Sequence, residues 1–119
     1  MMDYDCIQRL FGKAATAYAS ACAKHPVFPT VASHQPNWKR TMELEWLRRH
    51  FNHNDESRDC TIHSVQCEEL LEAIAEAEKG NWQEAIDETL HLIATAMRAI
   101  EFYDSQLGSN SQFTKIRKM

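Results

Sequence analysis

The sequence predicts an all-α protein, a four-helix bundle-like domain built on a helical hairpin that is rich in acidic residues. Three observations lead to this fold class. Apolar residues recur with helical rather than strand periodicity along residues 61–107, a single glycine interrupts that stretch at position 80, and two stretches upstream have the same periodicity. The chain is therefore expected to form two helices followed by a hairpin of two more.

The first predicted helix covers residues 3–24, where apolar side chains recur at helical spacing. They are Ile7, Leu10, Phe11, Ala14, Ala15, Tyr18 and Cys22. Residues 25–36 follow with all three prolines of the chain, which prevent a regular helix. Three apolar residues in this irregular segment, Val27, Phe28 and Val31, are expected to pin it to the body of the domain.

The second predicted helix runs from Asn37, as N-cap, to Phe51, and residues 52–59 are polar and end it. Its apolar face would consist of Trp38, Met42, Trp46 or Leu47, and Phe51. Trp38 and Trp46 suit stacking on a nucleotide base, and Lys39, Arg40, Arg48 and Arg49 suit phosphate groups. The alternative is that the tryptophans belong to the core and the cations are solvated.

The hairpin is predicted from its turn and its end signals. Gly80 is free to adopt the left-handed conformation that ends a helix. Asn81 followed by Glu84 is a capping-box pattern for the start of the next helix, and Gly108 would end that helix. The two arms are therefore predicted to be Thr61–Lys79 and Trp82–Leu107.

Length and composition favour one domain over residues 1–108 with a polar tail over 109–119, which frays or docks on a neighbour through Phe113 and Ile116. The chain has 119 residues, 44% of them hydrophobic, and a formal charge of −4. It has no long apolar run and no signal-like start, so no membrane association and a cytoplasmic location are expected. Without a long basic stripe, duplex nucleic acid is not an expected partner. The scattered cysteines favour buried thiols over disulfides: Cys6, Cys22, Cys60 and Cys67.

The acidic residues of the two arms are predicted to face each other. Glu69 and Glu72 lie about one helical turn apart on one face of the first arm. If the turn is centred near positions 80 and 81, these two residues lie opposite positions 92 and 89 of the second arm. Glu88 and His91 occupy that neighbourhood.

Carboxylates that converge in a partly dry groove repel one another and raise each other's pKa values unless a cation neutralises them. Hard oxygen ligands suit Mg²⁺ or Mn²⁺, which retain water and bridge to the phosphate oxygens of a substrate. The alternative is that the acids form a solvated helix surface, as most glutamate-rich faces do.

The residues of the hairpin resemble a known family. Glu68-Glu69-Leu70-Leu71-Glu72, then residues 73–87, then Glu88-Thr89-Leu90-His91 is similar to the paired acidic motifs of the all-α, MazG-like nucleoside triphosphate pyrophosphohydrolases. Residues 92–101 are similar to the helix that follows the second motif in short, often phage-associated members. The resemblance is close over the hairpin and loose over the N-terminal half.

By this resemblance the metal ligands would be Glu69, Glu72, Glu88 and His91, where His91 stands in place of the family's usual aspartate. A histidine can bind Mn²⁺ or another transition metal but suits Mg²⁺ less well. A rival alignment uses Glu84 and Asp87, which keeps the literal motif. We prefer Glu88 and His91, since the rival pair would lie about 7 Å along the helix axis from Glu69 and Glu72.

The resemblance also implies an activity, the hydrolysis of a (deoxy)nucleoside triphosphate to the monophosphate and pyrophosphate. A carboxylate that does not bind the metal, Glu68 or Glu76, would deprotonate the attacking water. Substrate binding is assigned to Trp38, Lys39 and Arg98. A homo-dimer or homo-tetramer is expected, both from the family and because apolar residues occupy more than one face of residues 86–102.

Two other functions stay open. One is a non-catalytic helical bundle that binds a nucleotide or a protein partner, the altered second motif marking a lost activity. The other is a zinc-stabilised adaptor, since His50-x-x-His53 and Cys60-x-x-His63, with Cys67 one turn further, have spacings that zinc tolerates.

Overall fold

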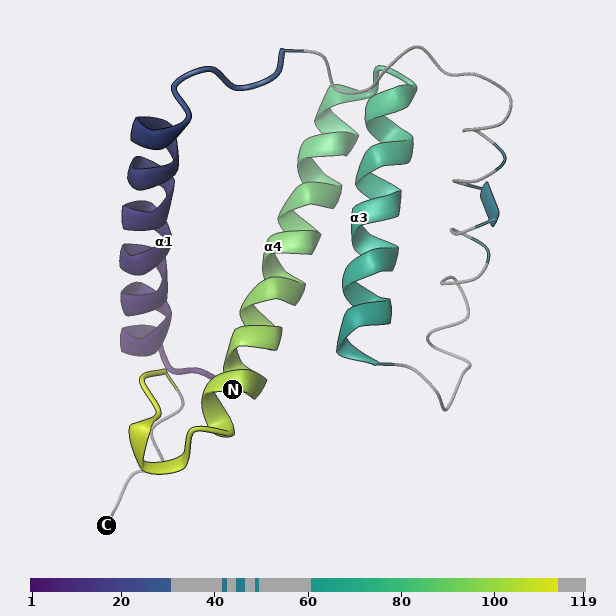
Figure 1. The fold of residues 1–119 in the computed structure, drawn as a ribbon. Coiled ribbons are helices and arrows are strands. Elements are labelled where there is room, and N and C mark those ends of the chain that lie inside the picture. Colours follow the sequence, from purple (N-terminus) through teal and green to yellow (C-terminus); the bar gives the residue numbers. More distant parts are fainter. Residues whose placement is uncertain (31–41, 43–44, 47–48, 50–60, 114–119) are drawn as a thin grey trace. The chain divides into compact units, whose positions relative to one another are not determined.

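The fold was obtained as a computed structural model, which describes residues 1–30, 42, 45–46, 49 and 61–113 (Figure 1). Three long helices occur in these residues, α1 (Tyr4–Lys24), α3 (Ile62–Glu78) and α4 (Trp82–Ser105), followed by the 3₁₀ helix η1 (Gly108–Asn110). The described residues contain no strand. The prediction of an all-α fold is confirmed.

The chain divides into two compact units, and α4 contributes to both. One unit comprises Met1–Thr30 and Arg98–Met119, and the other comprises Val31–Met97. The first therefore contains α1 and the end of α4, while the second contains α3 and the larger part of α4. The single domain over residues 1–108 stays a prediction, and the first part of the predicted tail, up to Phe113, belongs to the first unit.

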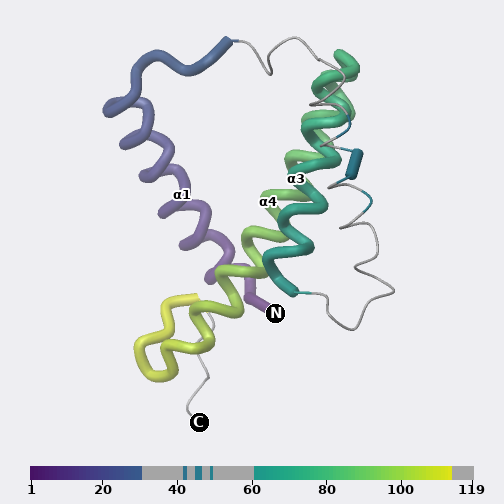
Figure 2. Tube along the Cα trace, turned by 45° about the vertical axis from the view of Figure 1, so that its right-hand side comes forward, coloured from purple at the N-terminus to yellow at the C-terminus, as the bar shows by residue number. Residues whose placement is uncertain are grey.

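The hairpin of the second unit forms where the sequence predicts it. Thr61 caps α3 by accepting a hydrogen bond from the Ser64 backbone N–H at 3.0 Å, and the Ser64 hydroxyl accepts one from the Thr61 N–H at 2.9 Å. Gly80 has φ +76°, the left-handed conformation expected of it. Helices α3 and α4 lie side by side in both views (Figures 1 and 2). The predicted arms are thus confirmed to within two residues at each end.

The turn between the helices is closed by hydrogen bonds from Asn81 back to α3. Its backbone N–H donates to the Glu76 carbonyl at 3.0 Å, and its side-chain amide donates to Glu76 Oε2 at 2.9 Å. These bonds fix the point at which the chain reverses. Since α3 and α4 run in opposite directions from that point, the hydrogen bonds of the turn also fix which residues of the two helices face each other.

The hairpin buries little apolar surface among the described residues. Leu71 and Ala73 are its buried side chains on α3. The larger apolar residues of the hairpin that remain exposed are Leu70, Trp82, Ile86, Leu90 and Ile93, with 45–61% of their surface accessible. Two helices alone cannot enclose a core, because each covers only one stripe of the other.

The first unit is held together at its chain ends. Asp3 caps α1 by accepting a hydrogen bond from the Cys6 N–H at 2.8 Å, and Met2, Cys6 and Leu10 are buried. The Met2 backbone N–H donates to Glu101 Oε2 on α4 at 2.7 Å. The described residues of α1 after Leu10 are exposed.

A buried acid, Asp104, holds residues 111–113 against the end of α4. Its two carboxylate oxygens accept hydrogen bonds from the Ser111 hydroxyl and from the backbone N–H groups of Gln112 and Phe113, at 2.6–2.7 Å. Phe113 is buried, and the Lys13 ammonium lies 5.8 Å from the centre of its ring. Phe113 is therefore packed within its own unit, docking on a neighbour stays a prediction, and Ile116 lies outside the described residues.

Some sequence predictions are not met, and others fall outside the described residues. Val27 and Phe28 are 86% and 82% exposed, so their predicted pinning is wrong: neither side chain is covered by another part of the described chain. Val31 and most of the second predicted helix, Asn37–Phe51, lie outside the described residues. Those of its residues that are described are helical: Met42, Glu45, Trp46 and Arg49.

The remaining expectations concern thiols and membranes. Three cysteines are free, of which Cys6 is buried, Cys67 half-buried and Cys22 exposed, so the expectation of buried thiols is wrong for Cys22. Cys60 lies outside the described residues. No helix in the described part of the chain has the length and apolar character needed to span a membrane.

Candidate metal centre

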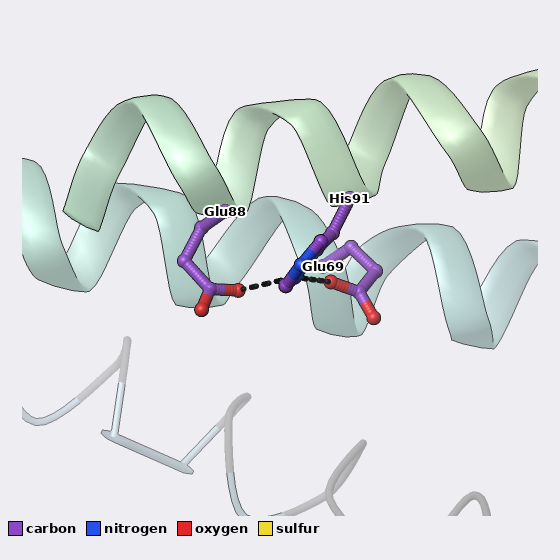
Figure 3. Close-up of side chains that lie close together, drawn as sticks. All are labelled: Glu69, Glu88 and His91. Atoms are coloured by element: carbon purple, nitrogen blue, oxygen red, sulfur yellow. Dashed lines mark ion pairs between the residues drawn. The ribbon is translucent and has the colours of Figure 1, made fainter. Parts of the chain in front are cut away.

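Three of the four predicted metal ligands lie together between the two helices of the hairpin. Glu69 comes from α3, and Glu88 and His91 come from α4, one turn apart on the same face. One potential ligand atom of each residue lies within 4.8 Å of those of the other two. Figure 3 shows the His91 ring between the two carboxylates. The predicted facing of the two arms at these positions is therefore seen in the structure.

The imidazole of His91 approaches both acids through the same ring nitrogen. His91 Nδ1 lies 3.4 Å from Glu88 Oε2 and 3.9 Å from Glu69 Oε2 (Figure 3). The His91 side chain is 62% exposed, whereas each glutamate side chain is 21% exposed. The cluster is thus lined by half-buried acids and open to solvent on the side of the histidine.

Glu69 and Glu88 each have one carboxylate oxygen for which the protein supplies no hydrogen-bond donor. Glu69 Oε2 and Glu88 Oε2 are buried and accept no hydrogen bond. Burial, with the charges of Glu88 and Glu68, raises the pKa of Glu69, although His91 opposes this shift. Buried carboxylate oxygens usually have donors, and a cation held between these residues could satisfy both atoms.

Glu72, the fourth predicted ligand, lies beside this group but is not part of it. Its carboxyl group shares a side-chain hydrogen bond with Glu88. Burial, that hydrogen bond and the charges of neighbouring acids raise the pKa of Glu72 from 4.5 to about 7. The facing of the two arms places Glu72 opposite position 89, and so next to Glu88, but helix spacing does not predict this hydrogen bond.

The two candidates for the catalytic carboxylate have different surroundings. Glu68 is half-buried, and its charge raises the pKa values of both Glu69 and Glu72. Glu76 instead bonds to the Asn81 amide at 2.9 Å and lies 3.5 Å from the Lys79 ammonium. Glu76 is thus engaged in the turn, whereas the charge of Glu68 acts on two of the predicted metal ligands.

The residues assigned to substrate binding are mostly beyond what the structure describes. Trp38 and Lys39 lie outside the described residues. Arg98 is exposed on α4 and belongs to the first unit. From the second predicted helix, Trp46 is 64% exposed and Arg49 pairs with Glu45 at 4.0 Å.

The rival alignment receives no support from the geometry. Glu84 is exposed, and Asp87 accepts a hydrogen bond from the Gln83 amide at 3.2 Å. Among the described residues, neither acid joins a group of three potential ligands. The register set by the turn brings Glu88 and His91 to Glu69 instead.

The predicted zinc ligands do not gather in the part of the chain that can be described. His63 is exposed and Cys67 is half-buried, and neither belongs to such a group there. The other three, His50, His53 and Cys60, lie outside the described residues.

No family model, curated protein or solved structure matches the chain. The resemblance to the pyrophosphohydrolases therefore depends on the motif residues of the hairpin, and the case for a site depends on the geometry of Glu69, Glu88 and His91.

Proposed function

We propose that the protein hydrolyses a (deoxy)nucleoside triphosphate to the monophosphate and pyrophosphate with the help of a divalent cation, Mg²⁺ or Mn²⁺. The observation that carries this proposal is the meeting of two buried carboxylate oxygens without donors, from Glu69 and Glu88, with the His91 imidazole. The order of these residues in the sequence, which is similar to that of the pyrophosphohydrolases, supports the choice of reaction.

In this proposal some residues of the hairpin hold the cation, and another acid acts on the attacking water. Glu69, Glu88 and His91 hold the cation, and Glu72, the fourth predicted ligand, adjoins them through Glu88. A cation held by these residues would supply positive charge that neutralises and orients the triphosphate. Glu68 takes a proton from water as the water oxygen bonds to the α-phosphorus, and the bond from that phosphorus to the departing pyrophosphate breaks.

Substrate binding is proposed for Trp38, Lys39 and Arg98. An indole ring suits stacking on the base, and the two cations suit the phosphate oxygens. A cytoplasmic location, where nucleoside triphosphates are abundant, belongs to the same proposal.

The proposal is tested by incubating the purified protein with a panel of natural and modified triphosphates and either Mg²⁺ or Mn²⁺. The proposal is supported if the wild type releases pyrophosphate, Glu69→Gln does not, and Asp87→Asn still does. If no triphosphate releases pyrophosphate with either cation, the enzymatic function is wrong.

A second candidate is a non-catalytic bundle that binds a nucleotide or protein partner. It is favoured by the exposed apolar residues along α4, where Trp82, Ile86 and Leu90 are 54–61% accessible. Such a protein would bind a nucleotide without turnover, and Glu72→Ala would leave its binding and stability nearly unchanged.

We also propose that the chain forms a homo-dimer or homo-tetramer. The same exposed stripe supports this, since a helix face of this kind is more stable when a second copy covers it. A monomer by light scattering at micromolar concentration would contradict the oligomer but leave the proposed reaction open.

A further inference from the structure

We propose that the hairpin site selects a first-row transition cation of the Mn²⁺ type over Mg²⁺, and that His91 is the residue which determines this preference. The inference deepens the proposed function, because it concerns the cation of the same site. It goes beyond the proposed function by assigning the choice of metal to one side chain.

The geometry of the three ligand atoms suits a shared ion. Atoms that bind one small divalent ion at about 2.1 Å are roughly 3–4 Å apart when they occupy neighbouring positions around it. His91 Nδ1 lies 3.4 Å from Glu88 Oε2 and 3.9 Å from Glu69 Oε2. Only small side-chain movements are therefore needed to bring the three atoms to one ion.

Two features of the cluster point to a cation rather than to a solvated ion pair. Glu69 Oε2 and Glu88 Oε2 are buried and accept no hydrogen bond, although both are oriented toward the histidine (Figure 3). The two atoms come from different helices and approach the same ring nitrogen, His91 Nδ1. A divalent ion would satisfy both oxygens and would balance the two negative charges.

The donor set decides between the two classes of ion. Mg²⁺ prefers oxygen ligands and gives up its water reluctantly, whereas Mn²⁺, Fe²⁺, Co²⁺ and Zn²⁺ accept imidazole nitrogen readily. In this cluster the histidine is also the most exposed member, which leaves room for water or a phosphate oxygen on its side. One nitrogen among two carboxylates therefore favours a transition metal.

The test measures binding of the cation alone, with no nucleotide present. Full-length protein is freed of metal by chelation, and the dissociation constants for Mn²⁺ and Mg²⁺ are measured for wild type, His91→Asp, His91→Ala and Asp87→Asn. Because His91 is exposed, its replacement should leave the helices intact, and circular dichroism checks this. Asp87→Asn is the matched control, since it removes a carboxylate one turn away that lies outside the cluster.

The wild type and Asp87→Asn should prefer Mn²⁺ to the same degree. His91→Asp should lower that preference by about tenfold or more, the scale on which changes around a metal ligand alter affinity. His91→Ala should weaken Mn²⁺ binding to a similar extent. The inference is overturned if His91→Asp leaves the ratio of the two constants unchanged, or if the wild type binds neither ion.

Its failure can be told apart from failure of the proposed function. Binding of Mn²⁺ that depends on His91, without release of pyrophosphate from any triphosphate, would sustain the inference and refute the hydrolase. Hydrolysis that runs equally well with Mg²⁺ in wild type and in His91→Asp would sustain the hydrolase and refute the inference.

Discussion

The two units of the chain each remove carboxylates from water, but they treat them in opposite ways. Asp104 is 5% exposed, and its two oxygens accept hydrogen bonds from Ser111, Gln112 and Phe113. Glu69 and Glu88 are less buried, yet each has a buried oxygen that accepts no hydrogen bond. The first arrangement is complete within the protein, and the second is completed by a cation in our proposal.

This difference gives a criterion for telling a structural acid from a functional one. A buried carboxylate with donors stabilises the chain segment that supplies them. Carboxylates that face each other without donors cost stability, so a structural role does not account for them. Substitution should therefore have opposite consequences in the two units, with function lost in one and stability lost in the other.

The largest expected effect is on turnover when an acid of the cluster is replaced. Glu69→Gln and Glu88→Gln should each lower pyrophosphate release by more than the roughly 10–100-fold that loss of an outer partner of a metal ligand costs. The measurement is a steady-state assay with Mn²⁺ at saturating triphosphate. Activity close to wild type in both variants would mean that these acids are merely surface residues.

The next effect is on stability when the structural acid is replaced. Asp104→Asn should cost about 2–3 kcal/mol, because a charged acceptor is lost and buried N–H groups lose a partner. Ser111→Ala, which removes one of the donors to Asp104, should cost about 1 kcal/mol. Denaturant unfolding gives these values, and hydrogen exchange at the Gln112 and Phe113 amides should accelerate. Unchanged exchange in Asp104→Asn would show that its hydrogen bonds do not hold the segment.

The third prediction concerns pH and the metal-free protein. The pKa of Glu72 is raised from 4.5 to about 7, so the folded protein holds a proton that the unfolded chain releases in that interval. Stability of the metal-free protein should therefore fall as pH rises from about 4.5 to about 7. Glu72→Gln should flatten this decline in a series of thermal unfolding curves. A stability that instead rises through the same interval in wild type would contradict the crowding of acids in the cluster.

A smaller effect than that of Asp104→Asn is expected at the turn that sets the register of the hairpin. Gly80 has φ +76°, and no atom lies within 4 Å of the position that a β-carbon would take, so Gly80→Ala should cost only the conformational penalty of roughly 1–2 kcal/mol. Gly12→Ala is the matched control, since Gly12 lies inside α1 with open space around it, and the change should stabilise by about 0.5–1 kcal/mol. Equal effects of the two substitutions on the melting temperature would contradict this account of the turn.

Much of the hairpin could be predicted from sequence because its signals are local. Helical periodicity, the cap at Thr61 and the left-handed Gly80 depend on residues close together in the chain, and they fix the register that places Glu88 and His91 beside Glu69. The end of α4 shows the limit of such signals: Gly108 is expected to end the helix after Leu107 and has φ +58°, but the helix ends at Ser105.

The features that sequence does not predict depend on burial or on longer-range contacts. Asp104 resembles any acid near a helix end, and its partners at 111–113 follow a glycine turn whose path periodicity does not specify. Phe28 is expected to be covered because it is apolar, but an apolar side chain is buried only where another surface meets it. The Glu72–Glu88 hydrogen bond depends on side-chain positions that helix spacing leaves open.

The most direct test of the contrast between the two units is a titration of Mn²⁺ into metal-free wild type, Glu88→Gln and Asp104→Asn, followed by calorimetry. We expect wild type and Asp104→Asn to bind one ion per chain with similar affinity and Glu88→Gln to bind it much more weakly, since Glu88, unlike Asp104, presents an oxygen without a donor to the cluster. Binding that is absent in wild type, or as tight in Glu88→Gln as in wild type, would contradict a metal site at Glu69, Glu88 and His91.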